Sequence, residues 1–471
     1  MSKIQNSSLF AMLVLVLPTA CTSPVSQQHS DVDTPSLWSR LIGSPQKADL
    51  NAPLVSAPDA EVEQRWWTHF EDPVLDALIS EALTRNTSLQ IAKARVDEAR
   101  ANHVIAGSRL LPEINGVGSA SRGNQGYATN NRIIGTAGAN IQATWELDLF
   151  GRNQALTAQA AAIWESTEAS RQAIRVSLLS DVAHTYFDLR NYERQVSLTK
   201  QNLETQKKTL ELIQAQQQGA LASDFDVQRA AAQVSSTEAL IPALQTAYDA
   251  SLNRLNVLLG YPPGTKDALL QSAWIEKPFN HQILVAAPAK VLATRPDIKV
   301  AERQYAASIS ATDAARAQMF PDISLTALFG VQTATSFPGM SPWNLGLNLV
   351  QPILNFGRIE SQIDVADSQQ KQAFLNYRQT VLNALENMEN ALSGYLHETT
   401  RNVSLTTGVA QNRKAAELAR QQYSNGYTGL LDVLVAERNL LDAESSQASS
   451  DASLRSGLVS IYAAAGGGWT E

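Results

Sequence analysis

Residues 320–332 read FPDISLTALFGVQ, and this stretch decides the fold. After the proline, apolar side chains alternate with mostly polar or small ones, which is the period of a β-strand with one apolar face. Residues 139–148 and 343–350 alternate in the same way, and residues 113–122 form a weaker, glycine-rich version. Each run has about ten residues, the length of a tilted strand that crosses a membrane. By itself the alternation would favour a half-buried hairpin in a soluble sheet, so the rest of the chain must decide.

The chain contains an internal two-fold repeat. Matching positions lie 206 to 209 residues apart and keep the same order along the sequence. The pairs are Pro112 with Pro321, Gly151 with Gly357, Arg152 with Arg358, Tyr186 with Tyr395, Gly219 with Gly426, and Asp226 with Asp432. Common order and nearly constant spacing predict a duplicated unit of helix, strand pair, long helix and shorter return helix.

The long helices are predicted from the absence of proline and from heptad spacing. Residues 151–218 contain no proline and could form one helix of about 100 Å at 1.5 Å per residue. Apolar side chains repeat there at intervals of seven, at Val182, Leu189, Val196, Leu203 and Leu210. Such a repeat predicts left-handed coiled-coil packing. The return helix carries Pro242, which should bend it or split it.

These patterns predict six segments. They are a signal peptide (1–20), a lipidated extended segment (21–60), a first repeat (61–259), a connector (260–295), a second repeat (296–465) and a flexible glycine-rich tail (466–471). The first repeat should hold a helix, a strand pair over about 113–149, a long helix over about 151–218 and a return helix over about 223–259. The second should hold a helix, a strand pair over about 322–353, a long helix over about 357–425 and a return helix over about 429–465.

The N-terminus resembles a secretory signal. Lys3 precedes an apolar run over residues 9–17 that is too short to span a bilayer. Ala20 precedes Cys21, the one cysteine of the sequence, which predicts lipid attachment at Cys21, although Pro18 stands where the lipidation signal usually has leucine. Lipidation would anchor the chain to a membrane.

Composition and motifs argue against several function classes. The net charge of −8 disfavours a nucleic-acid partner, which would require a basic surface. The six histidines are scattered, no metalloprotease or hydrolase motif occurs, and no phosphate-binding GxxxxGK[ST] loop is present. The sequence therefore predicts no enzyme, no catalytic residue, no metal and no cofactor.

Four membrane strands per chain imply an oligomer. An open sheet edge in lipid would leave backbone groups unpaired at several kcal/mol each, and small closed barrels start near eight strands. Two copies would supply eight strands and three would supply twelve. Helix pairs that leave the strands in one direction would form a tube around the same axis, so the assembly should be a conduit.

The motifs resemble a known family. Residues 145–152 (WELDLFGR), 294–298 (TRPDI), 351–358 (QPILNFGR) and the terminal GGGW at 466–469 are similar to those of TolC-type outer membrane factors, in particular the NodT and OprM lipoprotein branch. The resemblance covers about residues 60–465. It implies a homotrimer with a twelve-stranded transmembrane β-barrel continuous with a twelve-helix periplasmic coiled-coil barrel, and an equatorial domain built from the connector and terminal segments.

The same resemblance implies a function and its partners. The protein would be the outer-membrane exit duct of a tripartite efflux system, conducting small molecules passively. It would be anchored by lipid in the outer membrane and would work with a periplasmic adaptor and an inner-membrane pump of the RND type. Two alternatives remain open: an outer-membrane channel for protein export, and a lipid-anchored periplasmic coiled-coil adaptor. An adaptor should lack both the four strands and the repeat.

The resemblance also places a gate at the turns between long and return helices, near Gly219 and Gly426. Tyr423 matches a gate tyrosine, Asp432 matches the first aspartate of a constriction ring, and Asp226 matches an acid that bonds to the neighbouring helix. The sequence departs from the family at Val435, where a second ring aspartate is expected, and at Thr428, which is often charged. Alternatively, the two aspartates could simply cap helices, and Tyr423 could pack between helices.

The remaining repeated residues are interpreted as structural. Gly151 and Gly357 should permit the turn from strand to helix, and the following Arg152 and Arg358 should pair with nearby acids or lipid headgroups. Pro112 and Pro321 should end helices and set the entry into the strands.

Overall fold

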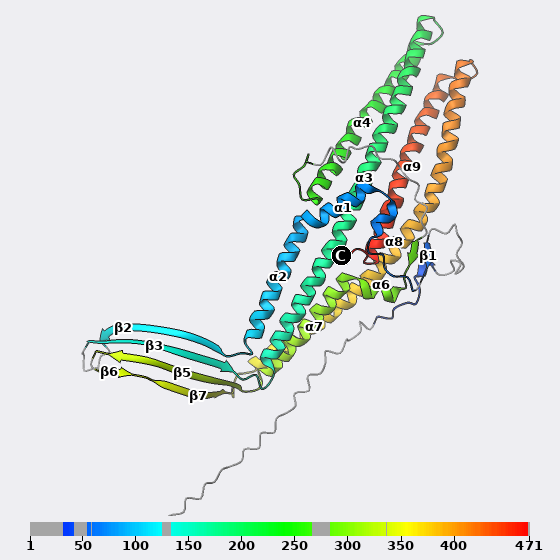
Figure 1. Cartoon of the computed structure of the whole chain (residues 1–471). Coiled ribbons are helices and arrows are strands. Elements are labelled where there is room, and N and C mark those ends of the chain that lie inside the picture. The colour runs from blue at the N-terminus through cyan, green and yellow to red at the C-terminus, as the bar shows by residue number, and fades with distance from the viewer. Residues whose placement is uncertain are drawn as a thin grey trace, which may run out of the picture.

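The computed structural model describes residues 32–41, 54–57, 59–124, 133–265, 283–335 and 337–469. Within these ranges the protein is a long rod of helices with one antiparallel sheet at its end (Figure 1). The predicted signal peptide and Cys21 lie outside the described residues, as do much of the predicted N-terminal segment and part of the connector.

The sheet contains the strands expected from the alternating runs. Their bounds are β2 Glu113–Asn124, β3 Ile133–Glu146, β5 Asp322–Ala334, β6 Phe337–Met340 and β7 Trp343–Val350. The order is β2-β3-β5, and β6 and β7 both pair with the far edge of β5. Gln332 pairs with Met340 and Phe329 with Trp343, so β6 and β7 keep one register across Pro342. They are two pieces of one strand, and the described sheet has four strand positions.

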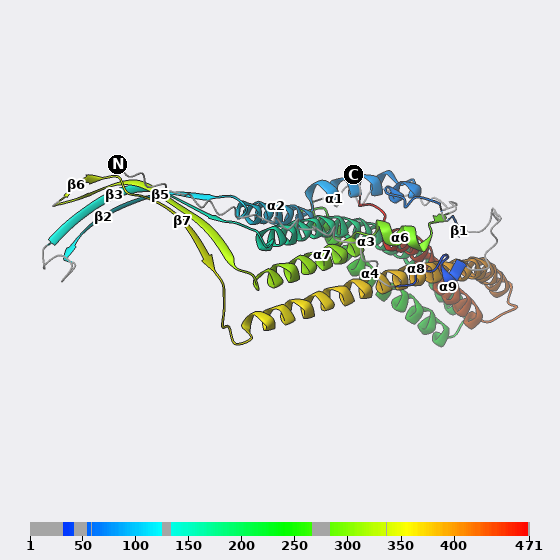
Figure 2. The same ribbon diagram turned by 90° about the horizontal axis from the view of Figure 1, so that it is seen from below.

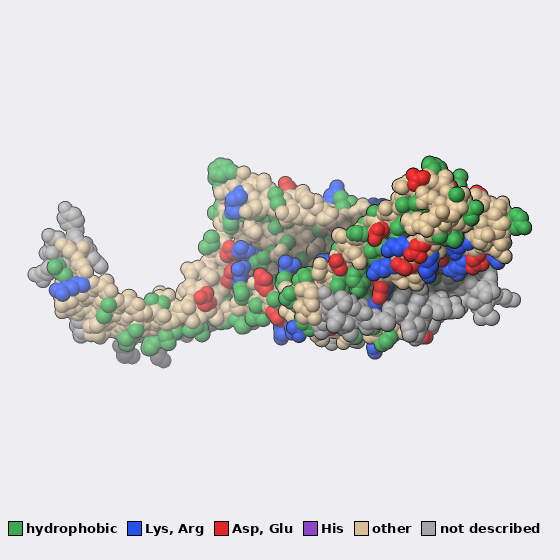
Figure 3. Space-filling view, turned by 90° about the horizontal axis from the view of Figure 1, so that it is seen from above, with side chains coloured by type: hydrophobic (Ala, Val, Ile, Leu, Met, Phe, Trp, Pro, Cys, Tyr) green, Lys and Arg blue, Asp and Glu red, His purple; other side chains and the backbone are tan. Residues whose placement is uncertain are grey.

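One face of this sheet is apolar and open. Phe329 on β5 and Trp343, Leu345 and Leu347 on β7 are 63 to 75% exposed, although all four lie in paired strands. Figure 2 shows the sheet curving away from the helices as a single layer, and Figure 3 shows charged side chains gathered over the helices and sparse over the sheet. An open apolar face of this size indicates contact with lipid or another chain. Among the described helices, none is both long and apolar enough to cross a membrane.

Helices form the rest of the molecule. Their bounds are α1 Pro73–Arg85, α2 Thr87–Ser108, α3 Arg152–Gln218, α4 Asp224–Leu258, α6 Pro288–Thr294, α7 Pro296–Ala317, α8 Arg358–Ser424 and α9 Leu430–Ala464, with 3₁₀ turns η1 Ser39–Leu41 and η2 Trp66–Phe70. The long helices α3 and α8 have 67 residues each, and the return helices α4 and α9 have 35 each. The long helices thus span about 100 Å, and the duplicated unit has kept its lengths.

The helices lie side by side in an open layer. Near the sheet the neighbours run α2-α3-α7-α8, and toward the tip they run α4-α3-α9-α8. In the described part of one chain, the outer sides of α2, α4 and α8 and the edge strands β2 and β7 lack a neighbour in the layer. Both the sheet and the helical layer are therefore arcs that need further copies to close.

The main hydrophobic core lies at the middle of the helices, which we call the waist. Buried side chains of η2, α1, α3, α4, α8 and α9 meet there, with Leu189, Leu255 and Leu392 fully buried. Strand β1 (Leu54–Ser56) pairs in parallel with β4 (Ile283–Val285) beside this core. One strand from the predicted N-terminal segment and one from the predicted connector thus lie side by side at the waist.

Two expectations need correction, and a third is narrowed. Of the bend or split expected at Pro242, the split does not occur, because α4 is continuous from Asp224 to Leu258. Pro242 and Glu238 are exposed, so the carbonyl that the proline frees can be hydrated. The first helix of the first repeat is two helices, α1 and α2, because Asn86 caps the start of α2. The tail was expected to be flexible, but its glycines pack against the rest of the protein. Gly467 and Gly468 are buried, and the Gly468 carbonyl accepts a hydrogen bond of 2.9 Å from Arg175 Nε.

Candidate functional site at the helical tip

The two helical hairpins end side by side at the point farthest from the sheet (Figure 1). In the first hairpin α3 ends at Gln218 and α4 begins at Asp224; in the second, α8 ends at Ser424 and α9 begins at Leu430. Gly426 has a left-handed backbone with φ of 79°, which glycine adopts without steric cost. The three predicted gate residues lie in or beside these two turns.

Asp226 caps the start of α4. Its Oδ2 accepts hydrogen bonds from the Ser223 hydroxyl (2.6 Å) and the Ser223 N–H (3.2 Å). The Ser223 hydroxyl oxygen accepts the Asp226 N–H in return, which completes a capping box. These bonds from Ser223 hold the pKa of the Asp226 carboxyl below its ordinary value. Within one chain, Asp226 therefore stabilises its own helix.

Asp432 occupies the equivalent place in the second hairpin. Its Oδ2 accepts the Gly429 N–H at 3.3 Å and also the hydroxyl of Thr428. The capping hydroxyl has moved one residue upstream, because Gly429 replaces serine at the cap. Thr428, the position where the family resemblance suggests a charge, thus supplies a neutral donor. Val435, one turn farther along α9, is 48% exposed and contributes no acid.

Tyr423 joins the two hairpins. Its hydroxyl donates a hydrogen bond of 2.8 Å to Gln216 Oε1 near the end of α3. Burial raises the pKa of the Tyr423 hydroxyl, and the nearby Asp226 carboxylate raises it further. The structure therefore brings Tyr423 and Asp226, predicted from different repeats, together at the tip. Ile213, Val227 and Leu430 form a small apolar cluster beneath them.

A buried ion pair nearby was not predicted. Glu437 on α9 is 1% exposed, and its Oε1 lies 2.8 Å from Arg420 Nε on α8 and 3.4 Å from the Thr209 hydroxyl on α3. A signal for it existed in the sequence, because acidic residues recur on α9 at positions 437, 444 and 451. Heptad spacing of acids on a packed helix indicates a polar seam, as heptad spacing of leucines indicates an apolar one.

The predicted turn residues lie at the junction of sheet and helices. Gly151 and Gly357 have φ of 77° and 82° and directly precede α3 and α8. Arg152 Nη1 lies 3.7 Å from Asp322 Oδ1 at the start of β5, whereas Arg358 donates to Gln362 within its own helix. Pro112 separates α2 from β2.

In the second repeat, Pro321 stands in the corresponding place between α7 and β5. The adjacent rings of Phe150 and Phe320 stack at 4.8 Å, which ties the two turns together. The junction is thus built from both repeats.

The histidines and other possible metal ligands of the described residues are the second candidate for a site. Among the described residues, no group of three histidine, cysteine, aspartate or glutamate side chains could hold a metal ion. His69 Nδ1 lies 3.0 Å from the Tyr462 hydroxyl, and the His103 ring stacks on Trp164. Burial lowers the pKa of His184. His69 and His103 thus pack against α9 and α3, away from the tip turns.

Comparison with known proteins shows which family has this architecture. The sequence profile of the family described as "Outer membrane efflux protein" matches residues 78–261 and 287–467. Nodulation protein T of Rhizobium leguminosarum bv. viciae is 30% identical over 98% of this chain and 94% of its own length. Pyoverdine export outer membrane protein OpmQ of Pseudomonas putida is 30% identical over 95% of this chain and 97% of its own. The solved outer-membrane channel OprN superposes with a TM-score of 0.83 at 30% identity, over 93% of this chain and 98% of that chain.

Proposed function

The chain belongs to the outer membrane efflux protein family, and on that premise we propose that its three-fold assembly is an exit duct gated at the helical tip. The predicted fold class, a trimeric β-barrel continuous with a helical barrel, is confirmed by the solved relatives. The protein is an outer-membrane efflux channel of the kind that serves tripartite pumps, so the export-channel and adaptor alternatives are not favoured. Its relatives are transport proteins rather than enzymes.

One observation gives the proposed duct its main support: in the described chain, the sheet and the helical layer are open at corresponding edges. Strand β7 has an unpaired edge on one side of the protomer and β2 on the other, and α8 and α2 lie at the same two sides of the helical layer. Pairing β7 of one copy with β2 of the next would close the sheet and bring α8 against α2 at once. Such closure satisfies every backbone edge within the membrane.

The gate is assigned to three residues. Asp432 would line the constriction with its two symmetry copies, giving three carboxylates because Val435 adds none. Tyr423 would hold the second hairpin against the first, supported by its bond to Gln216. Asp226 would contribute by fixing the start of α4 through its bonds with Ser223, and the proposed bond to a neighbouring helix would form only in the assembly. The capping bonds of Asp432 in the described chain use Oδ2, so Oδ1 would be the oxygen that faces the lumen and capping would be compatible with ring formation.

The anchor and partners follow from the family and from the N-terminus. Cys21 would carry lipid in the outer membrane, and residues 21–60 would then run from that anchor to the waist. The periplasmic tip would meet an adaptor and an inner-membrane pump, for which we propose the RND class. The cargo would be small molecules, since one relative, OpmQ of Pseudomonas putida, is a pyoverdine export protein. The repeats 61–259 and 296–465 would be the two structural units of each subunit.

Single-channel conductance in planar bilayers, with native mass of the same sample, tests the proposal. We expect a trimer with a small, cation-preferring conductance, because three carboxylates at a narrow opening attract cations. Asp432→Ala should increase the conductance and reduce cation preference. A trimer that conducts freely and ignores this substitution would move the gate elsewhere. A monomer without conductance would overturn the duct.

A further inference from the structure

Three acidic residues on α9 repeat at intervals of seven and all face other helices. Glu437, Glu444 and Asp451 lie along the side of α9 that packs between α3 and α8. A heptad seam normally carries apolar side chains, because these bury surface without loss of hydration. Acids at such positions must be matched by donors from the neighbouring helices. We call these three residues and their partners the α9 carboxylate ladder.

Each carboxylate bridges one donor on α8 and one on α3. Glu444 accepts from Arg413 Nη2 on α8 at 2.8 Å through Oε1 and from Asn202 Nδ2 on α3 at 3.3 Å through Oε2. Glu444 is only 11% exposed, whereas Arg413 is 57% exposed. The carboxylate thus belongs to the interface, and the cation reaches it from the surface.

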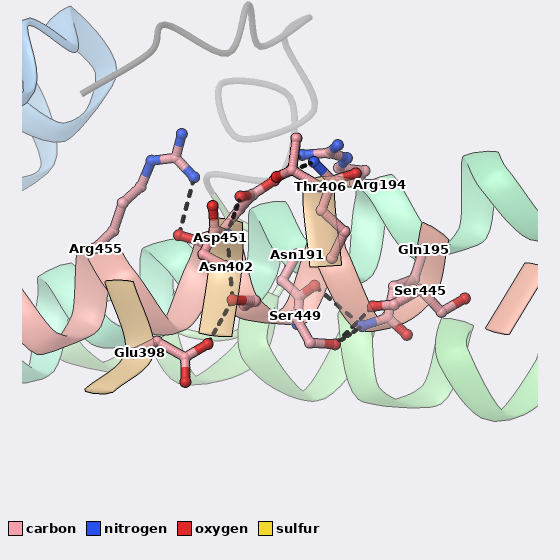
Figure 4. Close-up of polar contacts among 12 residues, drawn as sticks. Asn191, Arg194, Gln195, Glu398, Asn402, Thr406, Ser445, Ser449, Asp451 and Arg455 are labelled. Atoms are coloured by element: carbon pink, nitrogen blue, oxygen red, sulfur yellow. Dashed lines mark hydrogen bonds and ion pairs between the residues drawn. The ribbon is translucent and has the colours of Figure 1, made fainter. Parts of the chain in front are cut away.

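Each acid with its partners forms one level of the ladder. The level at Asp451, which lies nearest the waist, repeats this arrangement. Asp451 accepts from Asn402 on α8 at 2.7 Å and from Arg194 on α3 at 2.9 Å, again with one oxygen for each helix. Figure 4 shows these residues converging from the three helices, with Gln195 and Ser449 bonded one turn away. The same three helices are therefore linked at intervals of two turns along the seam.

The level nearest the tip is the least satisfied. Glu437 uses Oε1 for both Arg420 and Thr209, and among the described residues its buried Oε2 has no hydrogen-bond partner. Gln206, one turn along α3 from Thr209, is 2% exposed and its amide likewise lacks a partner in the described ranges. Unsatisfied buried polar atoms destabilise the closed arrangement at this level. The seam is therefore weakest next to the tip and stronger toward the waist.

Within the described residues, α4 of the first hairpin does not repeat the three acids. At the repeat offset of 206, the corresponding residues are Ala231, Glu238 and Gln245. Glu238, the one acid among them, is exposed. The duplication has kept the helix lengths, but the three buried or half-buried acids of α9 have no counterpart at these positions of α4.

From this asymmetry we propose that the α9 carboxylate ladder is the latch of the channel: it fixes α9 against α3, and the tip opens when its levels break in order from Glu437 toward Asp451. The inference rests on the proposed gated duct. Directed hydrogen bonds allow few relative positions of two helices, whereas an apolar seam tolerates small sliding. Glu437, Glu444 and Asp451 are thus positioning residues for the gate and do not line it.

Amide hydrogen exchange of the full-length trimer tests the latch itself and does not require conduction. We expect Glu444→Ala to increase exchange of the α9 amides over Leu430–Glu444 by about tenfold, which corresponds to about 1.4 kcal/mol. The matched control is Glu238→Ala, the corresponding position on α4, which should leave those amides unchanged. The charge swap Arg413→Glu with Glu444→Arg should restore slow exchange and shows that Glu444 variants can fold.

Conductance of the same variants tests the role in gating. Glu444→Ala should raise the open probability several-fold while native mass still shows a trimer, and the swap should reverse the effect. Equal exchange in Glu444→Ala and Glu238→Ala would overturn the latch. Faster exchange without a change in open probability would overturn its role in gating. A trimer that is silent in every form, wild type included, would overturn the duct, while exchange would still decide whether the ladder holds the hairpins together.

Discussion

The waist and the tip are built from the same helices but are held together by different interactions. At the waist, α3, α8 and α9 meet through fully buried apolar side chains such as Leu189, Leu392 and Val459. Toward the tip, the apolar cluster is small, and the helices are joined mainly by hydrogen bonds and ion pairs. Apolar burial does not depend on direction, whereas polar bonds are lost after small displacements. The comparison teaches that the waist can stay fixed while the tip moves.

The largest test of this comparison is truncation of an apolar side chain in each region. Leu189→Ala removes a fully buried side chain at the waist and should cost about 2–5 kcal/mol, because it leaves a cavity. Leu212→Ala lies on the same helix toward the tip, is 46% exposed, and should cost less than about 1 kcal/mol. The midpoint of thermal unfolding in detergent measures both. Equal shifts would show that the tip contributes as much as the waist to stability.

A second test compares two tyrosine hydroxyls. Tyr186 is fully buried and donates a bond of 2.6 Å to Asp72 Oδ2, and burial together with that carboxylate raises the pKa of Tyr186. Tyr186→Phe should cost about 1–3 kcal/mol, because a buried carboxylate oxygen loses a donor. Tyr423→Phe removes a partly buried bond between neutral groups and should cost about 1 kcal/mol or less. If unfolding midpoints rank the two in the opposite order, the distinction between the regions fails.

Two glycines provide a third, smaller test. A Cβ at Gly467 would lie 2.6 Å from the Glu63 carbonyl oxygen, so Gly467→Ala should destabilise the waist by about 1–3 kcal/mol through overpacking. A Cβ at Gly219 in the first tip turn would meet nothing nearer than 3.5 Å, and its φ of −82° suits any residue. Gly219→Ala should change stability by less than about 0.5 kcal/mol. Comparable losses in thermal midpoint would mean that the tip turn is as tightly packed as the waist.

The smallest expected effect is the pH response of the Asp226 cap. Because its hydrogen bonds from Ser223 lower the pKa of Asp226 in the folded chain, its contribution is present above the unfolded pKa of about 3.9 and is lost as pH falls through the folded value. Asp226→Asn should therefore reduce the acid sensitivity of the first tip turn below about pH 4. Hydrogen exchange of α4 amides near Asp226 measures this. An identical acid response in both proteins would show that the cap is not the titrating group.

Local sequence patterns predicted the elements well because local physics determines them. Alternation from Ile323 to Gln332 requires only that one strand face be apolar, and the long helices require only proline-free heptads. The fold class predicted from these patterns and the family motifs is confirmed by the solved relatives. The same patterns left open whether Pro242 would bend or split its helix; the helix is not split, because the proline is exposed and α4 packs on α3 both before and after it.

Contacts between distant segments could not be predicted in the same way. The burial of Gly467 and Gly468 depends on Glu63, Gln64 and Trp66, which are four hundred residues away and carry no pattern that points to the tail. The ladder could not be predicted without knowing that α9 faces α3, because Glu437 and Thr209 are paired only when the two helices pack in this register. The gate roles of Asp432, Tyr423 and Asp226 and the lipidation of Cys21 stay predictions, since they concern the assembled protein and residues outside the described ranges.

The equal lengths of the two hairpins have an evolutionary consequence. Each long helix has 67 residues and each return helix has 35, so the length of one repeat must match the length of the other for the hairpins to end side by side. An insertion of seven residues in α3 alone would move one tip by about 10 Å past its neighbour and uncouple every level of the ladder. Viable length changes must therefore arise in all four helices at once. Lineages of this channel should therefore accept substitutions at exposed positions of the tube far more often than an isolated insertion or deletion within it.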